Sequence, residues 1–242
     1  MAFWLDSTSE ASFDAAEQVD GSVLTNWYDI NPQSQTKNNF SGSGSSRPSY
    51  VKKCINDLPC VDFAGANYFS ITNTNTNLLV SQLTIFIVLK LDNIPPSGFS
   101  SLLMTNGNWS STGSMHLQIS NSSGKVTFGV VTRTPQDVWG ATNTTYVANK
   151  TYLMTSVDNS NTITVFVNGV NDIRSTQNIT VVGRARVYDL KIGGYFDGAS
   201  MVSTRYLDGK IGEIIVFNRG LKSDEITSVN RYLGAKWGVT TP

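Results

Sequence analysis

Alternation of apolar and polar residues is the feature that most limits how this chain can fold. Apolar side chains occupy every second position in three separate segments, 115–119, 126–130 and 163–167. A period of two places successive side chains on opposite faces of a strand, so each segment is expected to bury one face. Residues 85–91 are apolar at nearly every position, which is typical of a central strand covered on both faces. These patterns predict two antiparallel sheets packed face to face.

One segment near the C-terminal end has helical periodicity instead. The apolar residues that fall on one helical face are Ile226, Val229, Leu233 and Trp237. Ser223 is expected to cap the N-terminus of this helix, and the acidic residues 224–225 suit the positive end of the helix dipole. Gly238 is expected to end the helix. A single amphipathic helix after many strands is predicted to pack its apolar stripe against the outside of the sandwich.

The composition indicates one domain that binds neither nucleic acid nor a membrane interior. All-β sandwiches of about this length commonly form one domain, so we assign residues 1–242 to one unit. Only 15% of the residues are charged, the net charge is zero, and there is no Lys/Arg cluster to bind phosphates. The N-terminus lacks the pattern of a signal peptide. The longest apolar stretch, 83–91, is too short to cross a bilayer, so we expect no membrane insertion.

The cysteines and the histidine limit the metal and redox chemistry. The chain has two cysteines, Cys54 and Cys60, and one histidine, His116. The cysteines fit either one short-loop disulfide or a reduced pair. A single histidine excludes a His-rich metal site. His116 lies on the polar side of an alternating segment, so we interpret it as an ordinary surface or sheet-face residue.

Short motifs follow one another in a characteristic order along nearly the whole chain. They occupy residues 4–6, 23–29, 47–50, 59–65, 166–169, 190–194, 209–219 and 233–239. In order and spacing they resemble the laminin-G-like jelly-roll branch of the concanavalin A-like lectin/glucanase superfamily, of the kind found in phage and viral surface proteins. The resemblance implies an all-β fold: a two-sheet antiparallel jelly-roll sandwich (concanavalin A-like) with one C-terminal helix. It also places Trp4, Trp27 and Trp237 in the core.

The acidic residues argue against catalysis. Catalytic members of this superfamily carry a Glu-x-Asp-x-x-Glu strand, whose spacing places a nucleophile and an acid on one face. This sequence has no such run, and its only glutamates are Glu10, Glu17, Glu213 and Glu225. We therefore expect no enzymatic activity and no catalytic residues.

No cofactor is predicted, although laminin-G-like domains often hold calcium. Such a site needs several oxygen ligands. Asp137, Asp197 and Asp208 lie in or beside predicted loops and could contribute to it. The alternative is that these carboxylates cap turns.

The candidate ligand-binding residues are Trp109, Trp139, Asp137 and Tyr146. Sugar sites on sandwiches use an exposed aromatic ring for the apolar face of the sugar and Asn or Asp for its hydroxyls. Trp109 lies in a polar loop, and Trp139 has Asp137 and Tyr146 nearby in sequence. Tyr195–Phe196, after a glycine pair, is a further candidate. The alternative for each ring is packing beneath its own loop.

Three functional classes follow from the resemblance and the residues. The first is a non-enzymatic virion surface component, such as a capsid decoration, head fibre or tail-associated protein. Its partners would be glycans or neighbouring virion subunits, and a homo-oligomer is compatible with that role. The second is a secreted or cell-surface carbohydrate-binding module. The third is an unusual glycosidase. The first two classes predict a location on the virion surface or outside the cell.

Overall fold

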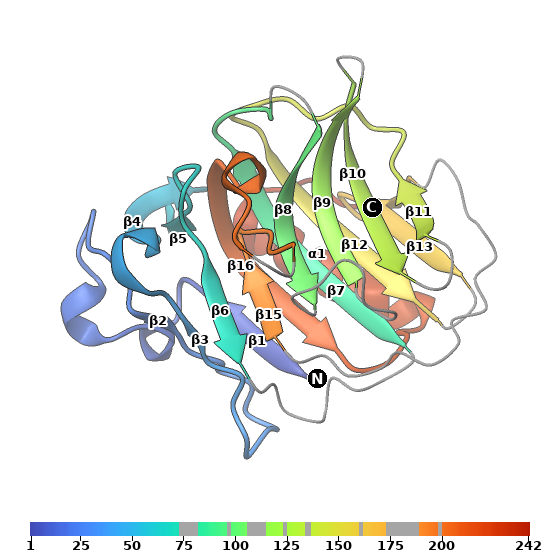
Figure 1. Cartoon of the computed structure of the whole chain (residues 1–242). Coiled ribbons are helices and arrows are strands. Elements are labelled where there is room, and N and C mark those ends of the chain that lie inside the picture. Colours follow the sequence, from blue (N-terminus) through green and yellow to red (C-terminus); the bar gives the residue numbers. More distant parts are fainter. Residues whose placement is uncertain are drawn as a thin grey trace.

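The computed structural model describes residues 1–72, 82–95, 98–105, 115–122, 125–133, 137–159, 162–172, 189–197 and 200–242. Within these ranges the chain forms two antiparallel sheets of eight strands each and one α-helix. The sheets stack face to face (Figure 1). This arrangement confirms the two-sheet antiparallel sandwich predicted from the alternation.

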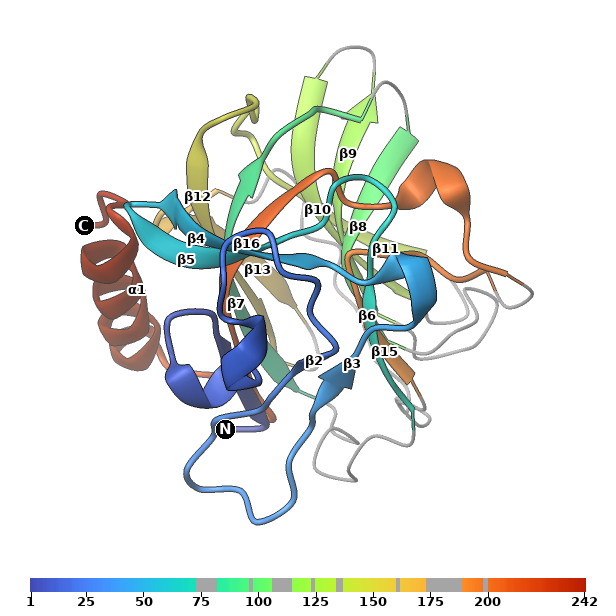
Figure 2. The same cartoon turned by 90° about the vertical axis from the view of Figure 1, so that its left-hand side faces the viewer.

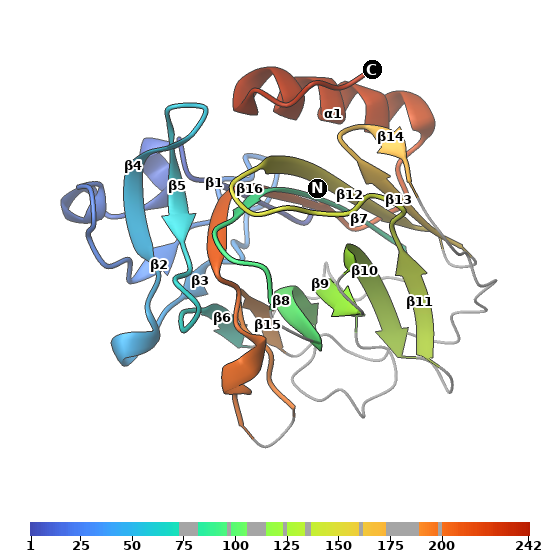
Figure 3. The ribbon, with the colours of Figure 1, turned by 90° about the horizontal axis from the view of Figure 1, so that it is seen from above.

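The first sheet carries the helix on its outer face (Figure 3). Its strands run in the order β14 (Val170–Asn171), β13 (Ile163–Val167), β12 (Thr151–Asp158), β7 (Leu83–Leu91), β16 (Gly209–Phe217), β5 (Leu58–Asp62) and β4 (Ser49–Ile55). The eighth strand, β1 (Phe3–Asp6), pairs with the C-terminal half of β16. β5 pairs with its N-terminal half.

The second sheet closes the other side of the core (Figure 2). Its strands run in the order β11 (Asp137–Ala141), β10 (Lys125–Arg133), β9 (Met115–Ser122), β8 (Gly98–Thr105), β15 (Asp189–Ile192), β6 (Phe69–Thr72), β3 (Phe40–Ser41) and β2 (Asn26–Trp27). β9, β10 and β13 correspond to the three alternating segments. The inward residues of β9 and β13, among them Leu117 and Val165, join the core between the sheets.

β7 shows why one segment is apolar without alternation. Ile85, Ile87 and Leu89 face the core between the sheets. Phe86 and Val88 belong to a second apolar cluster, which lies between the first sheet and the helix. Both faces of β7 are therefore buried, as its sequence predicts.

The helix α1 (Ser223–Trp237) ends at Gly238, which adopts a left-handed conformation with φ of 69°. Ser223 is its first residue and Lys222 is the flanking cap, so the prediction that Ser223 is the N-cap was wrong. The Lys222 N–H donates to the Glu225 carboxylate at 2.9 Å, so the side chain of the third helical residue bonds back to the backbone of the cap position. The stripe packs on the first sheet as predicted, with Leu233 and Trp237 buried.

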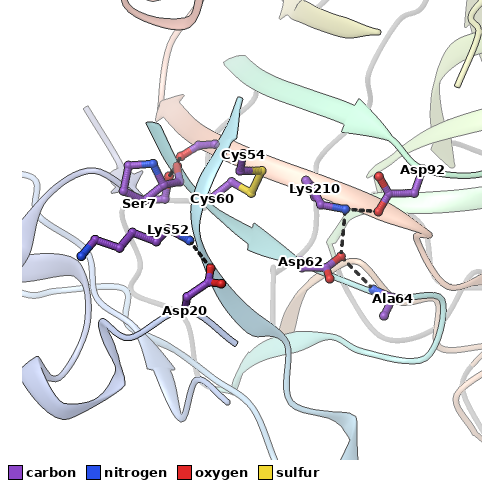
Figure 4. Close-up of a disulfide and its surroundings, with 11 residues drawn as sticks. Ser7, Asp20, Lys52, Cys54, Cys60, Asp62, Ala64, Asp92 and Lys210 are labelled. Atoms are coloured by element: carbon purple, nitrogen blue, oxygen red, sulfur yellow. Dashed lines mark hydrogen bonds and ion pairs between the residues drawn. A yellow bond between two sulfur atoms is a disulfide. The ribbon is translucent and has the colours of Figure 1, made fainter. Parts of the chain in front are cut away.

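Cys54 and Cys60 form a disulfide across the β4–β5 hairpin (Figure 4). The turn residues Asn56 and Asp57 both have positive φ. The Asn56 side chain donates to the Lys236 carbonyl at 3.0 Å, so the hairpin tip contacts the C-terminal end of α1. Nearby, Lys210 forms ion pairs with Asp62 and Asp92. Among the described residues, no helix has the length and apolar character needed to cross a membrane.

Candidate functional site

The structure describes the four residues that the sequence singled out to different extents. Trp109 lies outside the described residues. Asp137 and Trp139 belong to β11, where the backbone is described and the side chains are not. Tyr146 lies in the core with 1% of its surface exposed. These placements leave the two tryptophans as predictions.

Tyr146 needs a correction. Its ring packs edge-on against Tyr152 with the centroids 4.5 Å apart, and burial raises the pKa of its hydroxyl. A ring with so little exposed surface offers no face on which a sugar can stack. The alternative weighed for loop aromatics, packing beneath the loop, therefore holds for Tyr146.

Strand register connects Trp139 to the rest of the second sheet. Trp139 pairs with Val131, and Val131 pairs with His116 of β9. His116 pairs with Met104 of β8, which in turn pairs with Lys191 of β15. These five residues form one row across the sheet. Their neighbours Leu117 and Ile192 face the core, so His116 and Lys191 face away from it.

Residues 193–197 and 200–207, which we call the 193–207 loop, cover this outer face. The Leu207 N–H donates to the Gly193 carbonyl at 2.8 Å, which closes the base of the loop. The Val202 N–H donates to the Tyr195 carbonyl at 2.9 Å, which folds its first part into a hairpin. The short 3-10 helix η5 (Ser203–Arg205) follows and contacts β8. Figure 3 shows this segment on the side of the second sheet away from α1.

The loop brings three rings and one guanidinium together. Phe99 lies 5.0 Å from His116 and 5.2 Å from Tyr195, measured between ring centroids. His116 and Tyr195 are 5.2 Å apart. The Arg205 guanidinium lies 4.2 Å above the centre of the Phe99 ring. Phe99, Tyr195 and Arg205 are half-buried. We call these four residues the aromatic platform.

Gly98 allows Arg205 to take this position. A Cβ atom at residue 98 would lie 1.9 Å from Nη1 of Arg205, and the backbone φ there is 74°. Arg205 also donates to the Phe99 carbonyl at 3.4 Å. A cation held over an aromatic face is attracted by the electron density of the ring. The glycine therefore supplies both the conformation and the space that the stacked guanidinium requires.

His116 is buried, with 1% of its surface exposed, so of the two alternatives for this residue the surface one was wrong and the sheet-face one is confirmed. It faces outward from its strand, as the alternation predicts, but the 193–207 loop covers it. Its Nε2 is 3.0 Å from the Ser101 hydroxyl. Burial, and next the positive charge of Arg205, lower the pKa of His116 to about 3. It is therefore neutral at physiological pH.

Further aromatic side chains adjoin the platform. Tyr68 and Tyr206 stack with their centroids 6.1 Å apart and their planes 27° apart. The Lys191 ammonium lies 5.0 Å from the centre of the Phe196 ring. The rings of Tyr68, Tyr206 and Phe196 are partly exposed, as is that of Tyr195. Such surfaces combine apolar faces with polar groups, which is the combination that sugar recognition requires.

Two carboxylates meet beneath α1 and not on the platform. Asp6 and Glu213 are cross-strand partners, and Lys236 bonds both of them, at 2.7 and 2.8 Å. The indoles of Trp4 and Trp237 donate to Glu213 at 2.7 and 2.8 Å. Burial, and next the charge of Asp6, raise the pKa of Glu213. The Glu213 side chain is fully buried, so this pair has no access to a substrate.

Trp4, predicted to be core, is only partly buried.

The aspartates considered for calcium have separate roles where their side chains are described. Asp197 accepts the Ser200 N–H at 2.9 Å and so caps a turn. Asp208 accepts the Asn93 amide at 2.8 Å. Among the side chains that the structure describes, no group of three or more His, Cys, Asp or Glu residues could hold a metal ion. Calcium binding was only an alternative to the expectation of no cofactor, and both stay predictions.

Comparison with known proteins identifies the family. The laminin G model of the concanavalin A-like lectin/glucanases superfamily matches residues 63–227. Comparison of the sequence with curated proteins gives no match.

Several solved structures have a similar fold. Domain 4 of AbnA, a GH43 extracellular arabinanase from Geobacillus stearothermophilus solved with arabinotriose, is 10% identical, with a TM-score of 0.59 over 95% of this chain and 97% of that domain. The CBM40 of the Ruminococcus gnavus IT-sialidase is 19% identical, with a TM-score of 0.52 over 64% and 85%. Trypanosoma rangeli sialidase is 15% identical, with a TM-score of 0.62 over 99% of this chain and 33% of the sialidase. At these identities the likeness concerns the fold alone.

Proposed function

The chain belongs to the concanavalin A-like lectin/glucanases superfamily, and from that premise we propose that it is a non-catalytic carbohydrate-binding domain that contacts glycans through the aromatic platform. The observation that carries the proposal is the grouping of Phe99, Tyr195 and Arg205 on the outer face of the second sheet. Partly exposed rings can stack on the apolar face of a sugar, and a guanidinium can donate to its hydroxyls.

The solved relatives support this class of ligand. The arabinanase domain was solved in complex with arabinotriose. The Ruminococcus gnavus CBM40 was solved bound to α2,3-sialyllactose. The first is one domain of an arabinanase, and the second is the CBM40 of a sialidase. The fold that they share with this chain supports the proposal that it also recognises glycans.

The placement of the glutamates supports the absence of catalysis. Glu17 accepts the backbone N–H and the hydroxyl of Thr25. Glu225 forms a two-fold ion pair with Arg219. Glu213 is enclosed by two indoles and Lys236. Retaining glycoside hydrolysis needs two carboxyl groups that both reach the glycosidic bond, and these side chains are engaged elsewhere.

The disulfide supports a location outside the cytosol, because disulfides persist mainly in oxidising compartments. A secreted or cell-surface module fits this location. Display on a virion stays a prediction from the sequence resemblance. Detection of the protein in purified particles, with its loss on mild surface proteolysis, would support display on a virion.

A glycan array tests the proposed function directly. The wild type should bind at least one class of glycan, and Tyr195→Ala should weaken that binding by about tenfold or more, since a stacked ring contributes on the order of 1–3 kcal/mol. Tyr232→Ala is the matched control, because Tyr232 is 44% exposed and lies on α1, on the opposite side of the sandwich. Binding by no glycan, or equal loss in both variants, would overturn the proposal.

Two further arms complete the experiment. Trp109→Ala and Trp139→Ala on the same array test the tryptophans predicted from the sequence. An assay for reducing ends released from every bound glycan tests the absence of catalysis. Release that disappears when one glutamate is replaced by glutamine would show that the domain is an enzyme.

A further inference from the structure

A cleft of about 540 Å³ lies at the β13–β14 edge of the first sheet. Its sides are the loop of residues 144–150, the β13–β14 hairpin and residues 240–242. The aromatic platform lies on the outer face of the other sheet, so the two surfaces are separate. In Figure 3, β14 and α1 lie on the same side of the molecule, and the 193–207 segment lies on the other side.

The hairpin turn determines the shape of the cleft. Asn168 and Gly169 both have positive φ, 51° and 78°. A Cβ atom at residue 169 would lie 3.0 Å from Pro242 and 3.3 Å from Thr241. The Thr241 and Pro242 side chains therefore pack directly on Gly169 and form one wall.

Three polar side chains line the cleft with atoms that can bind a ligand. Asp172 accepts the Thr144 N–H at 2.9 Å through Oδ2, which holds the carboxylate in place while Oδ1 can accept another bond. The Asn168 oxygen accepts the Leu153 N–H at 3.0 Å, so its NH2 group is the part that can donate to a ligand. The Lys150 ammonium lies 5.4 Å from the centre of the Tyr152 ring, and both residues line the cleft.

The cleft lining also has an apolar part, which is partly exposed. Val170 has 55% of its surface exposed. Val167 and Pro242 extend this surface, and the Thr144 and Thr241 side chains lie at its margins. A ligand for such a cleft has an apolar face of modest size and several groups that both donate and accept hydrogen bonds.

Sugar hydroxyls have this property, because each can donate to a carboxylate and accept from an ammonium or amide. The Asp172 carboxylate disfavours an anionic ligand, and the Lys150 ammonium disfavours a cationic one. An apolar ligand would offer no partner to the remaining donors and acceptors of these side chains. We propose that this cleft is a second glycan-contact site that takes a neutral oligosaccharide. The proposal rests on the proposed function and adds a site that is independent of the platform.

Nuclear magnetic resonance titration with arabinotriose, xylotriose, cellotriose and maltotriose tests the site in the whole chain. At least one of these neutral sugars should shift the backbone amide signals of Thr144, Lys150 and Asp172. Lys150→Ala and Asp172→Asn should each lower its affinity by about tenfold, the scale of losing one hydrogen bond to a charged group. Lys53→Ala and Asp224→Asn are the matched controls, because both residues are exposed and lie away from the cleft.

The outcomes separate this site from the proposed function. If a sugar binds and the shifts are confined to Phe99, Tyr195 and Arg205, the second site is wrong and the carbohydrate-binding function stands. If a sugar binds and the Lys150 and Asp172 variants match their controls, the second site is also wrong. If neither these sugars nor any glycan on the array binds the wild type, both proposals fail. Shifts at the cleft that survive Tyr195→Ala would support an independent second site.

Discussion

The indole of Trp237 donates to the buried carboxylate of Glu213 at 2.8 Å, which joins the last turn of α1 to the centre of the first sheet. The same ring packs on Gly212, where a Cβ atom would lie 2.7 Å from the ring carbons. The absence of a side chain at residue 212 lets the helix lie close to β16. Trp237 therefore combines apolar burial with a bond to a charged group.

Replacing Trp237 should destabilise the fold strongly. Trp237→Ala is expected to lower the free energy of unfolding by about 3–5 kcal/mol, because a large buried ring is lost and Glu213 loses a donor. Trp237→Phe should cost less, since most of the ring volume remains. Urea denaturation at neutral pH measures both changes. A loss below about 0.5 kcal/mol for the alanine variant, the range of ordinary surface changes, would contradict this role.

The buried histidine should make the protein sensitive to mild acid. The pKa of His116 is about 3 in the folded chain and about 6.5 when unfolded. Between about pH 6.5 and pH 3 the unfolded chain therefore binds a proton at His116 and the folded chain does not. The free energy of unfolding is consequently highest above about pH 6.5 and falls as the pH is lowered below it. At pH 5 the loss should be about 2 kcal/mol relative to pH 7.5.

His116→Gln is the control for this prediction. Glutamine can still bond Ser101 but does not titrate, so the difference between urea denaturation at pH 7.5 and pH 5 should shrink by about the same amount. Because His116 is the only histidine in the chain, no other imidazole contributes. An unchanged pH dependence in the variant would show that His116 is not the cause.

The fold was predictable because its signals are local. The period of two in residues 163–167 and the helical stripe ending at Trp237 each depend on a few neighbouring positions. The faces that these residues bury follow from the backbone period alone. The N-cap was predicted wrongly at Ser223 because the helix begins one residue earlier than expected, with Lys222 as the cap and Glu225 accepting the Lys222 N–H. Residue preferences alone do not decide between these two neighbouring starts.

The candidate site was predictable only in part, because its residues are distant in sequence. Phe99 and Arg205 are brought together by the 193–207 loop, and no local pattern pairs them. Tyr195 was identified from its position after two glycines, which signal a turn. His116 was placed on the correct face of its strand, but its burial depends on that same loop. Tyr146 was misplaced because the position of a ring in a loop has no period from which to infer burial.

The disulfide should contribute measurably to stability. Cys54 and Cys60 are six positions apart, and closing so short a loop is expected to stabilise the fold by about 2 kcal/mol. The double variant Cys54→Ala/Cys60→Ala should therefore unfold at lower urea. Intact-mass measurement with and without reductant shows whether the bond is present in the wild type. If the wild type has the same urea midpoint with and without reductant, the disulfide does not stabilise the fold.

Gly98→Ala should weaken glycan binding, although Gly98 has no side chain with which to contact the sugar. The new Cβ would lie 1.9 Å from Nη1 of Arg205, so the guanidinium must leave its place over Phe99. Gly21→Ala is the matched control, because Gly21 also has a positive φ, 79°, but has open space around its Cβ position. Both variants should lose about 1–2 kcal/mol of stability from the left-handed conformation. Only Gly98→Ala should lose affinity for the glycan, measured by isothermal titration at a temperature where both are folded. Equal affinity in the two variants would show that the position of Arg205 does not matter for binding.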